Sequence, residues 1–279
     1  MAKYLIALRF LLLSPLWVVN CERLPKTYPS LERQISALQT ELENKDELIA
    51  MLRIKTLNEQ ERIAELEKKL AELKQSSNKC QTSSCLCKST ELHEIKLPGR
   101  QAFQVSCDSS LVDPGWTVIL RRIDGKVDFN RNWREYQQGF GDLRGEFFIG
   151  LDKLHQITNS QRHELYIYLR NEHNETRFAR YDNFLIADDN DSFRIKSLGV
   201  YSGDAGDAMA AHLNMQFSTF DLDNDNSNRN CADENSSGWW FNDCYQCNLN
   251  GLYNSGFYWY KWQRNLLKFA QVMIRPKEL

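Results

Sequence analysis

Three aspartates alternate with other residues in one polar stretch of the chain, FDLDNDNSNRN, at Asp221, Asp223 and Asp225. Hard divalent cations such as calcium bind about six to eight oxygen ligands, and alternating acids in a loop can direct several oxygens at one centre. An EF-hand loop starting at Asp221 would need glycine and glutamate where this protein has Asn226 and Ala232. The pattern therefore does not fit an EF-hand, and it leaves two interpretations, a calcium site of another kind and a solvated acidic turn.

Cysteine is the second reactive residue type of the protein, with eight copies. Cys80, Cys85 and Cys87 crowd into one short segment, with no histidine at a spacing that suits zinc. Disulfides are therefore expected, and Cys80 and Cys85 are candidates for interchain bonds at the end of the stalk described below. If Cys21 is removed with a signal peptide, seven cysteines remain, and an odd count indicates an interchain bond or a free thiol.

Signatures of common enzymes are not found in the sequence. It contains no GxSxG elbow, no HExxH pair and no Walker loop. Its five histidines are scattered without ligand spacing, at His93, His155, His163, His173 and His212. We therefore expect a binding protein and not an enzyme.

The N-terminus has the pattern of a secretory signal. Lys3 and Arg9 precede an apolar run over residues 10–19, which is too short to span a bilayer. We assign residues 1–21 to a signal peptide and expect a secreted, extracellular product with no membrane anchor. The formal net charge of −2 argues against a nucleic-acid partner, which would call for a basic surface.

A heptad repeat follows and continues without a slip. With d at Leu31, the a positions are Ile35, Leu42, Ile49, Thr56, Ile63 and Leu70, and the other d positions are Leu38, Lys45, Leu52, Glu59, Leu66 and Leu73. Ten of these thirteen residues are apolar, which is typical of a coiled coil and predicts one over residues 31–74. Because such a helix is not stable alone with its seam in water, we expect a homo-oligomer, a dimer or a trimer.

The composition changes twice after the stalk. Residues 75–86 are polar and break the heptads, so we interpret them as a cysteine-containing linker. From residue 87 the sequence contains β-rich runs such as WTVIL and HELYIYL, a short helical pattern at 151–158 and long Asn- and Asp-rich loops. This pattern predicts an α+β domain over residues 87–279.

Several longer phrases of this domain are more specific. They are WTVILRRIDGKVDFNRNWREYQQGFGDLRGEFFIGLDKLHQIT (116–158), HELYIYL (163–169), ARYDNF (179–184), FSTFDLDNDN (217–226), NCADENSSGWWFNDC (230–244) and NLNGLY (248–253). Together and in this order they resemble the fibrinogen C-terminal domain family. The resemblance implies an α+β fibrinogen C-terminal-like globe, here preceded by an all-α coiled-coil stalk.

The resemblance also implies disulfides and a metal site. The family's two bridges map onto Cys87–Cys107 and Cys231–Cys244, with Cys85 able to replace Cys87 in the first. The family's calcium site maps onto the carboxylates of Asp223 and Asp225 and the main-chain carbonyls of Ser227 and Arg229. The implied cofactor is therefore Ca²⁺, and Asp221 is expected beside the ligands and not among them.

A ligand-binding region is implied next to the second bridge. In the lectin-like branch of the family, which includes ficolins and tachylectins, this region binds acetylated groups and contains a non-proline cis peptide, here Asp243–Cys244. The matching residues are Trp240, Phe241, Asp243, Cys244 and Tyr245. The sequence departs from that branch, because Tyr245 stands where the lectins usually have histidine and the Tyr-Ala-Asn-Gly segment of the acetyl pocket is missing.

Three sequons, at Asn174, Asn190 and Asn235, are candidates for N-glycosylation in a secreted protein. Taken together, these features predict a secreted, calcium-dependent, multivalent recognition protein that binds glycans or microbial surfaces, lectin-like and active in innate immunity. The alternatives are a signalling ligand for a cell-surface receptor, similar to angiopoietins, and a structural matrix glycoprotein.

Overall fold

The computed structural model describes residues 28–80, 83–262 and 267–277. The protein divides into two compact units, Met1–Ala71 and Glu72–Leu279. The predicted signal peptide, residues 1–21, lies outside the described residues. None of the helices in the described part combines the length and the apolar character that a membrane span requires.

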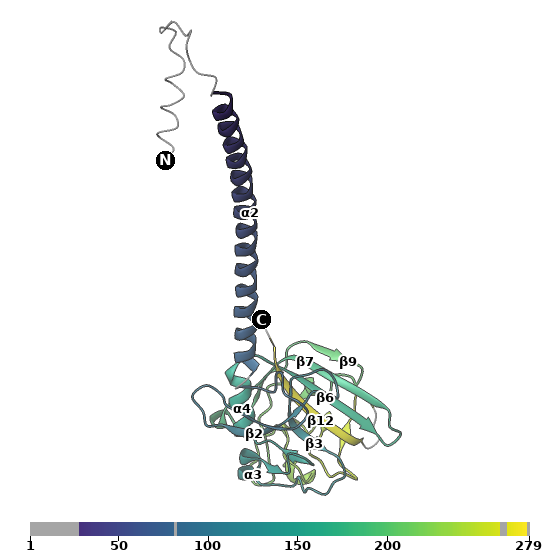
Figure 1. The fold of residues 1–279 in the computed structure, drawn as a ribbon. Coiled ribbons are helices and arrows are strands. Elements are labelled where there is room, and N and C mark those ends of the chain that lie inside the picture. Colours follow the sequence, from purple (N-terminus) through teal and green to yellow (C-terminus); the bar gives the residue numbers. More distant parts are fainter. Residues whose placement is uncertain (1–27, 81–82, 263–266, 278–279) are drawn as a thin grey trace. The chain divides into compact units, whose positions relative to one another are not determined.

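Helix α2 runs from Tyr28 to Cys80 (Figure 1). It contains the predicted coiled coil and continues into the predicted linker 75–86, which is therefore shorter than expected, since residues 75–80 contain neither glycine nor proline. The predicted seam is exposed, as Leu38, Leu52 and Leu66 show at 65%, 53% and 56%. The side chain of Cys80, an interchain candidate, lies outside the described residues.

The globe is built on one large antiparallel sheet, which confirms the predicted α+β class (Figure 1). Its main path has the order β1-β2-β3-β12-β6-β7-β8. These strands are β1 (Leu92–Ile95), β2 (Phe103–Asp108), β3 (Trp116–Arg122), β12 (Leu267–Pro276), β6 (His163–Asn171), β7 (Thr176–Ile186) and β8 (Ile195–Ser197). Three short strands join it from the side, namely β4 (Phe140–Gly141), β5 (Phe147–Phe148) and β9 (Tyr201–Gly203).

Strand β12 occupies the middle of the sheet. It pairs with β3 on one side, for example Val272 with Leu120, and with β6 on the other, Val272 with Ile167. Both neighbours are rich in β-branched, aromatic and leucine residues, which suit strands covered by other elements. Most of the side chains of β3 and β6 are buried accordingly.

Strand β3 changes partner along its length. Its first half pairs with β2, where Ser106 lies opposite Val118, and its second half pairs with β5, where Leu120 lies opposite Phe148. The sheet therefore forks between β2 and β5. Arg121 stands at this fork.

Short helices and one small ribbon complete the globe. They are α3 (Trp133–Gln138), α4 (Leu151–Ser160), α5 (Cys231–Glu234), the 3₁₀ turns η1 (Asp189–Asp191) and η2 (Met209–His212), and the ribbon of β10 (Cys247–Asn248) and β11 (Tyr258–Trp259). Helix α3 begins with a capping box, in which Asn132 accepts from the Glu135 N–H and Glu135 accepts from the Asn132 N–H. Helix α4 buries Leu151, Leu154 and Ile157.

The first disulfide joins Cys85 to Cys107, with the Cα atoms 5.5 Å apart. The expected Cys87–Cys107 pairing is therefore wrong, and Cys85 is not available for an interchain bond. The reason is burial: Cys85 lies in the core beside β2, whereas Cys87 is exposed and has a positive φ of 63°. Cys87 is itself disulfide-bonded.

Candidate functional site

The acidic loop is organised around Asp225. Its Oδ1 accepts from the N–H of Ser227 at 2.8 Å, and its Oδ2 accepts from the N–H of Cys231 at 2.8 Å. Asp223 lies beside it and accepts from the N–H of Asp225 at 3.1 Å. Asp225 thereby ties the loop to the first residue of α5.

The two carboxylates are close enough to affect one another. Burial raises the pKa of Asp225 and the neighbouring Asp223 carboxylate raises it further, against the opposing effect of the N–H groups of Cys231 and Ser227. Among the described residues, the carbonyl oxygens of Ser227 and Arg229 accept no hydrogen bond. The loop thus contains two adjacent carboxylates and two carbonyl oxygens that accept no hydrogen bond among the described residues. This set of oxygen atoms fits the coordination of a divalent cation such as calcium.

No group of three or more His, Cys, Asp or Glu side chains in the described part of the protein is arranged to hold a metal ion. A cation in this loop would therefore depend on main-chain oxygens and water as well as on Asp223 and Asp225. Asp221 is occupied elsewhere, because its Oδ1 accepts from the N–H of Trp133 at 2.9 Å and from the Thr219 hydroxyl at 2.7 Å. Asp221 thus anchors the loop to the start of α3, beside the candidate ligands.

The second disulfide connects the loop to the predicted ligand region. Cys231 is bonded to Cys244, with the Cα atoms 5.6 Å apart, and the Asp243–Cys244 peptide is cis. Both features follow the family pattern. A side-chain pair adds a second connection, since Asn226 donates through Nδ2 to Asn242 Oδ1 at 2.9 Å. The acidic loop and the segment before Tyr245 are therefore held together at two points.

The predicted ligand residues do not all reach the surface. Trp240 and Phe241 are buried in the core, at 4% and 0% exposure, so their side chains do not form walls of a surface site. The Trp240 indole instead donates to the carbonyl oxygen of Phe193 at 2.8 Å. Asp243 is exposed, and Cys244 and Tyr245 are half-buried.

Tyr245 belongs to a stack of three tyrosines. Its ring stacks on Tyr260 with centroids 5.6 Å apart and planes 9° apart, and Tyr260 stacks on Tyr258 at 5.3 Å and 17°. Burial, followed by the neighbouring Tyr260 hydroxyl, raises the pKa of Tyr245. A cavity of about 460 Å³ lies beside the stack, lined by Tyr245, Tyr260, Gln246 and Lys261.

The sequence contains a signal for this stack. In Tyr258-Trp259-Tyr260 the middle ring is buried and its neighbours are not, as alternation along a strand requires. Trp259 donates its indole N–H to the carbonyl oxygens of Ala205 and Gly206, each at 3.0 Å, and so fixes the strand.

His212 is the supporting residue that the sequence did not reveal. Its Nδ1 lies 2.7 Å from the carbonyl oxygen of Trp240, and its Nε2 lies 3.3 Å from the N–H groups of Gln246 and Cys247. Because a carbonyl only accepts and an N–H only donates, the ring is neutral with its proton on Nδ1. Burial lowers the pKa of His212 to about 4, in keeping with this state.

The remaining sequence candidates are distributed over the globe. Asn174 and Asn190 are exposed, whereas Asn235 is half-buried and donates through Nδ2 to the carbonyl oxygen of Cys231 at 2.7 Å. Cys247 is a free thiol in the core, at 0% exposure, with its sulfur 3.5 Å from that of Met209.

Comparison of the sequence with known proteins identifies a matching family and its relatives. The model of the C-terminal globular domain of fibrinogen β and γ chains matches residues 76–277. Fibrinogen-like protein 1 of Homo sapiens is 40% identical over 201 residues, 63% of this chain and 64% of that protein. Tenascin of Gallus gallus is 41% identical over 194 residues, 66% of this chain and 11% of tenascin. The protein thus spans less than two thirds of the length of either relative.

Solved structures agree with the sequence comparison. The structure of the fibrinogen-like globe of human ANGPTL2 superposes on this protein with a TM-score of 0.68 at 34% identity. The match covers 71% of this chain and 100% of the ANGPTL2 globe. Lamprey fibrin D-dimer, solved with the peptide Gly-His-Arg-Pro-amide, gives a TM-score of 0.64 at 29% identity over 91% of this chain and 96% of that one. The predicted resemblance is confirmed, and the protein belongs to the family defined by the C-terminal globular domain of the fibrinogen β and γ chains.

Proposed function

We propose that this protein is an extracellular, multivalent recognition protein whose globe binds a protein partner through the tyrosine stack of Tyr245, Tyr258 and Tyr260. The observation that carries the proposal is the stack itself, placed next to the Cys231–Cys244 bridge. Tyrosine is enriched where proteins bind one another, because it contributes a large rigid surface with a polar tip. The buried bridges are consistent with an oxidising, extracellular setting.

The geometry of the stack favours a protein over a sugar. A sugar ring binds to the open face of an aromatic ring, but the ring of Tyr260 stacks on two other rings, those of Tyr245 and Tyr258, which leaves less open face for a sugar. The edges and hydroxyl groups of the rings remain, together with Lys261 and Gln246 at the cavity. Such a surface can meet a protein with both apolar contacts and hydrogen bonds.

Multivalency comes from helix α2. Its exposed seam of leucine and isoleucine would be buried by further copies of the protein. Several globes carried on one stalk bind clustered partners by avidity even when each contact is weak. The relatives include a matrix protein, tenascin, and the ANGPTL2 globe, so a matrix partner and a cell-surface receptor are both within the proposal.

Calcium is part of the proposal as a stabiliser of the site. Asp223, Asp225 and the carbonyls of Ser227 and Arg229 would hold the ion, which would relieve the repulsion between the two carboxylates. Since Asp225 also accepts from the N–H of Cys231, an ordered loop keeps α5 and the segment before Tyr245 in place. Calcium would act through this loop and would not itself contact the partner.

Glycan recognition is the second candidate. It is supported by the cavity of about 460 Å³ beside Tyr245, which is large enough for a monosaccharide. In this case the cavity, and not the stack, would receive the ligand, and the lectin-like, innate-immune function expected from the sequence would apply.

One experiment separates the two. The oligomer would be applied to a glycan array and to an array of extracellular proteins, in calcium and in EDTA, with Tyr260→Ser as the site variant and Tyr168→Ser, on β6, as the matched control. Binding to a protein that Tyr260→Ser removes supports the proposal. Glycan binding that depends on Tyr245 and Lys261, with no protein bound, would establish the second candidate instead.

A further inference from the structure

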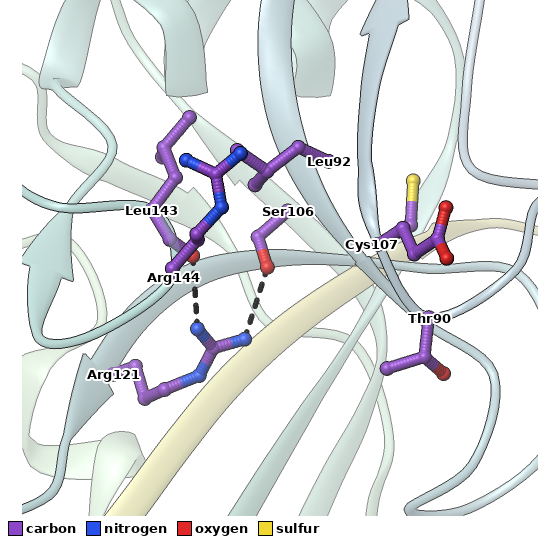
Figure 2. Close-up of a pocket in the computed structure, with 8 residues that line it drawn as sticks. Thr90, Leu92, Ser106, Cys107, Arg121, Leu143 and Arg144 are labelled. Atoms are coloured by element: carbon purple, nitrogen blue, oxygen red, sulfur yellow. Dashed lines mark hydrogen bonds between the residues drawn. The ribbon is translucent and has the colours of Figure 1, made fainter.

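A second cavity lies at the fork of the sheet, on strands that do not contribute to the tyrosine stack. Its volume is about 500 Å³, and it is lined by the start of β1, by β2 and β3, and by the turn between β4 and β5. It forms because β2 and β5 both pair with β3 and part at Arg121. Figure 2 shows Arg121 reaching to Leu143 on one side and to Ser106 on the other.

Arg121 is held rigidly in this cavity. Its Nε donates to Gln271 Oε1 at 2.7 Å, its Nη1 donates to the carbonyl oxygens of Leu143 and Gly145 at 3.0 and 3.4 Å, and its Nη2 donates to Ser106 Oγ at 3.0 Å. These are four of its five N–H groups. Among the described residues the fifth, on Nη2, has no acceptor.

The charge of Arg121 is not neutralised by a direct contact. Arg121 is connected to the carboxylate of Asp108 only through Gln271. The side chain of Gln271 accepts from Arg121 and donates to Asp108 at 2.8 Å. Within the described residues, neither Arg121 nor the second arginine of the cavity, Arg144, forms an ion pair. Arg121 is half-buried and Arg144 is exposed, and guanidinium groups without an ion-pair partner are suited to bind carboxylates.

The other lining groups narrow the class of ligand. Glu91 contributes one carboxylate, so the lining has two positive charges and one negative charge. Glu91 and the hydroxyls of Thr90 and Ser106 can accept hydrogen bonds from ligand hydroxyls, and the half-buried Leu92 and Leu143 give apolar contact. A compact ligand with one carboxylate, several hydroxyls and C–H surface matches this lining.

We infer that the cavity at the fork binds a carboxylated sugar, such as a uronic acid, with its carboxylate on Arg121 and Arg144. This site differs from the proposed partner site in both its residues and its ligand. Through it the globe would attach to acidic polysaccharides while the tyrosine stack remains free.

The test uses two monosaccharides that differ at one carbon. Sodium glucuronate and glucose have the same ring, but the first carries a carboxylate where the second carries a hydroxymethyl group. Both would be titrated into the ¹⁵N-labelled full-length protein, and amide shifts would be followed at the Thr90–Leu92 and Leu143–Gly145 segments, with sodium sulfate as the third titrant. Saturable shifts are expected with glucuronate and not with glucose.

Arg144 is exposed, so its replacement should leave the fold intact. Arg144→Gln is expected to weaken glucuronate binding about tenfold, the loss of one charge-assisted contact. Arg134→Gln, an exposed arginine on α3, is the matched control and should bind as the wild type does. Equal binding by the two variants, or no saturable shift with glucuronate, would overturn the inference. If sulfate bound as tightly as glucuronate, the cavity would bind anions in general, and the assignment to a carboxylated sugar would be overturned.

Discussion

His212 donates its Nδ1 proton to the carbonyl oxygen of Trp240 at 2.7 Å, from a position 28 residues earlier in the chain. The other ring nitrogen accepts from the backbone at Gln246 and Cys247. One neutral imidazole therefore fastens both ends of the segment that contains the Cys244 half of the bridge and Tyr245. Protonation would place a second donor against N–H groups and break this arrangement.

Acidification should therefore destabilise the globe. The pKa of His212 is lowered by burial to about 4 in the folded protein, against about 6.5 when unfolded. The unfolded state then binds the proton first, so the stability is complete above about pH 6.5 and is lost as the pH falls towards 4. The expected loss from this residue is about 2 kcal/mol of unfolding free energy at pH 5, measured by denaturant titration at pH 7 and pH 5.

His163 adds an effect of the same sign, because burial also lowers its pKa to about 4. His212→Gln should therefore reduce the difference between pH 7 and pH 5 by about half. His173→Gln, at an exposed ring, is the control variant and is measured at the same two pH values. If His212→Gln kept the full pH dependence, the role assigned to the buried ring would be wrong.

Glu146 supports the turn after β3 with four backbone contacts. Its carboxylate accepts from the N–H groups of Ile123, Asp124, Gly125 and Val127 at 2.8 to 3.2 Å, and it faces the Arg122 guanidinium, with Nε at 3.6 Å. Glu146→Ala would leave these four N–H donors without an acceptor and the buried Arg122 cation without its counter-ion, although Arg122 would still donate to the carbonyl oxygens of Leu249 and Gly251. We expect a loss of roughly 3–5 kcal/mol in thermal or denaturant unfolding.

Glu94→Ala, on the exposed face of β1, is the comparison for Glu146→Ala and should change stability by no more than about 0.5 kcal/mol. A similar small effect of both variants would show that the amide cluster contributes little.

The cysteines predict a labelling pattern. Peptide mapping without reduction should give one cross-linked pair from Cys85 and Cys107 and another from Cys231 and Cys244. Cys247 should resist iodoacetamide until denaturant is added, because burial of the thiol raises its pKa well above the usual value and keeps reagents out. Rapid labelling of Cys247 in the native protein, or a peptide joining Cys87 to Cys107, would contradict the structure.

The seam of helix α2 predicts self-association. Replacing Ile63 and Leu66 by aspartate puts two charges into the seam and should reduce the assembly to monomers in sedimentation equilibrium. Lys68→Asp lies on the opposite face of the same turn and should leave the assembly mass unchanged. A wild-type protein that sediments as a monomer would remove the multivalency from the proposed function.

Sequence periodicity was sufficient for the helix and for the class of the globe. The seam from Leu31 to Leu70 repeats without a slip, and the phrases around Trp116 and Cys231 identify the family before any contact is known. Local spacing could not decide between Cys85 and Cys87, because the two lie only two residues apart and differ in which one enters the core.

The interior contacts of the site were harder to foresee. Trp240 and Phe241 are aromatic, and composition alone does not separate a buried ring from one at the surface. His212 acts on residues 28 and 35 positions away, so its role depends on the folded path of the backbone. Tyr258 and Tyr260 could have been recognised from their alternation with Trp259.

The central position of β12 bears on how the globe is made. During translation, β3 and β6 leave the ribosome long before residues 267–276. Each of them therefore has an edge with unpaired backbone N–H and C=O groups until β12 inserts between them. A premature stop before Leu267 would leave two half-sheets with open edges, a state prone to aggregate. The cell must therefore shield the nascent polypeptide until β12 has emerged, and a truncation that removes β12 should be less tolerated than loss of the stalk.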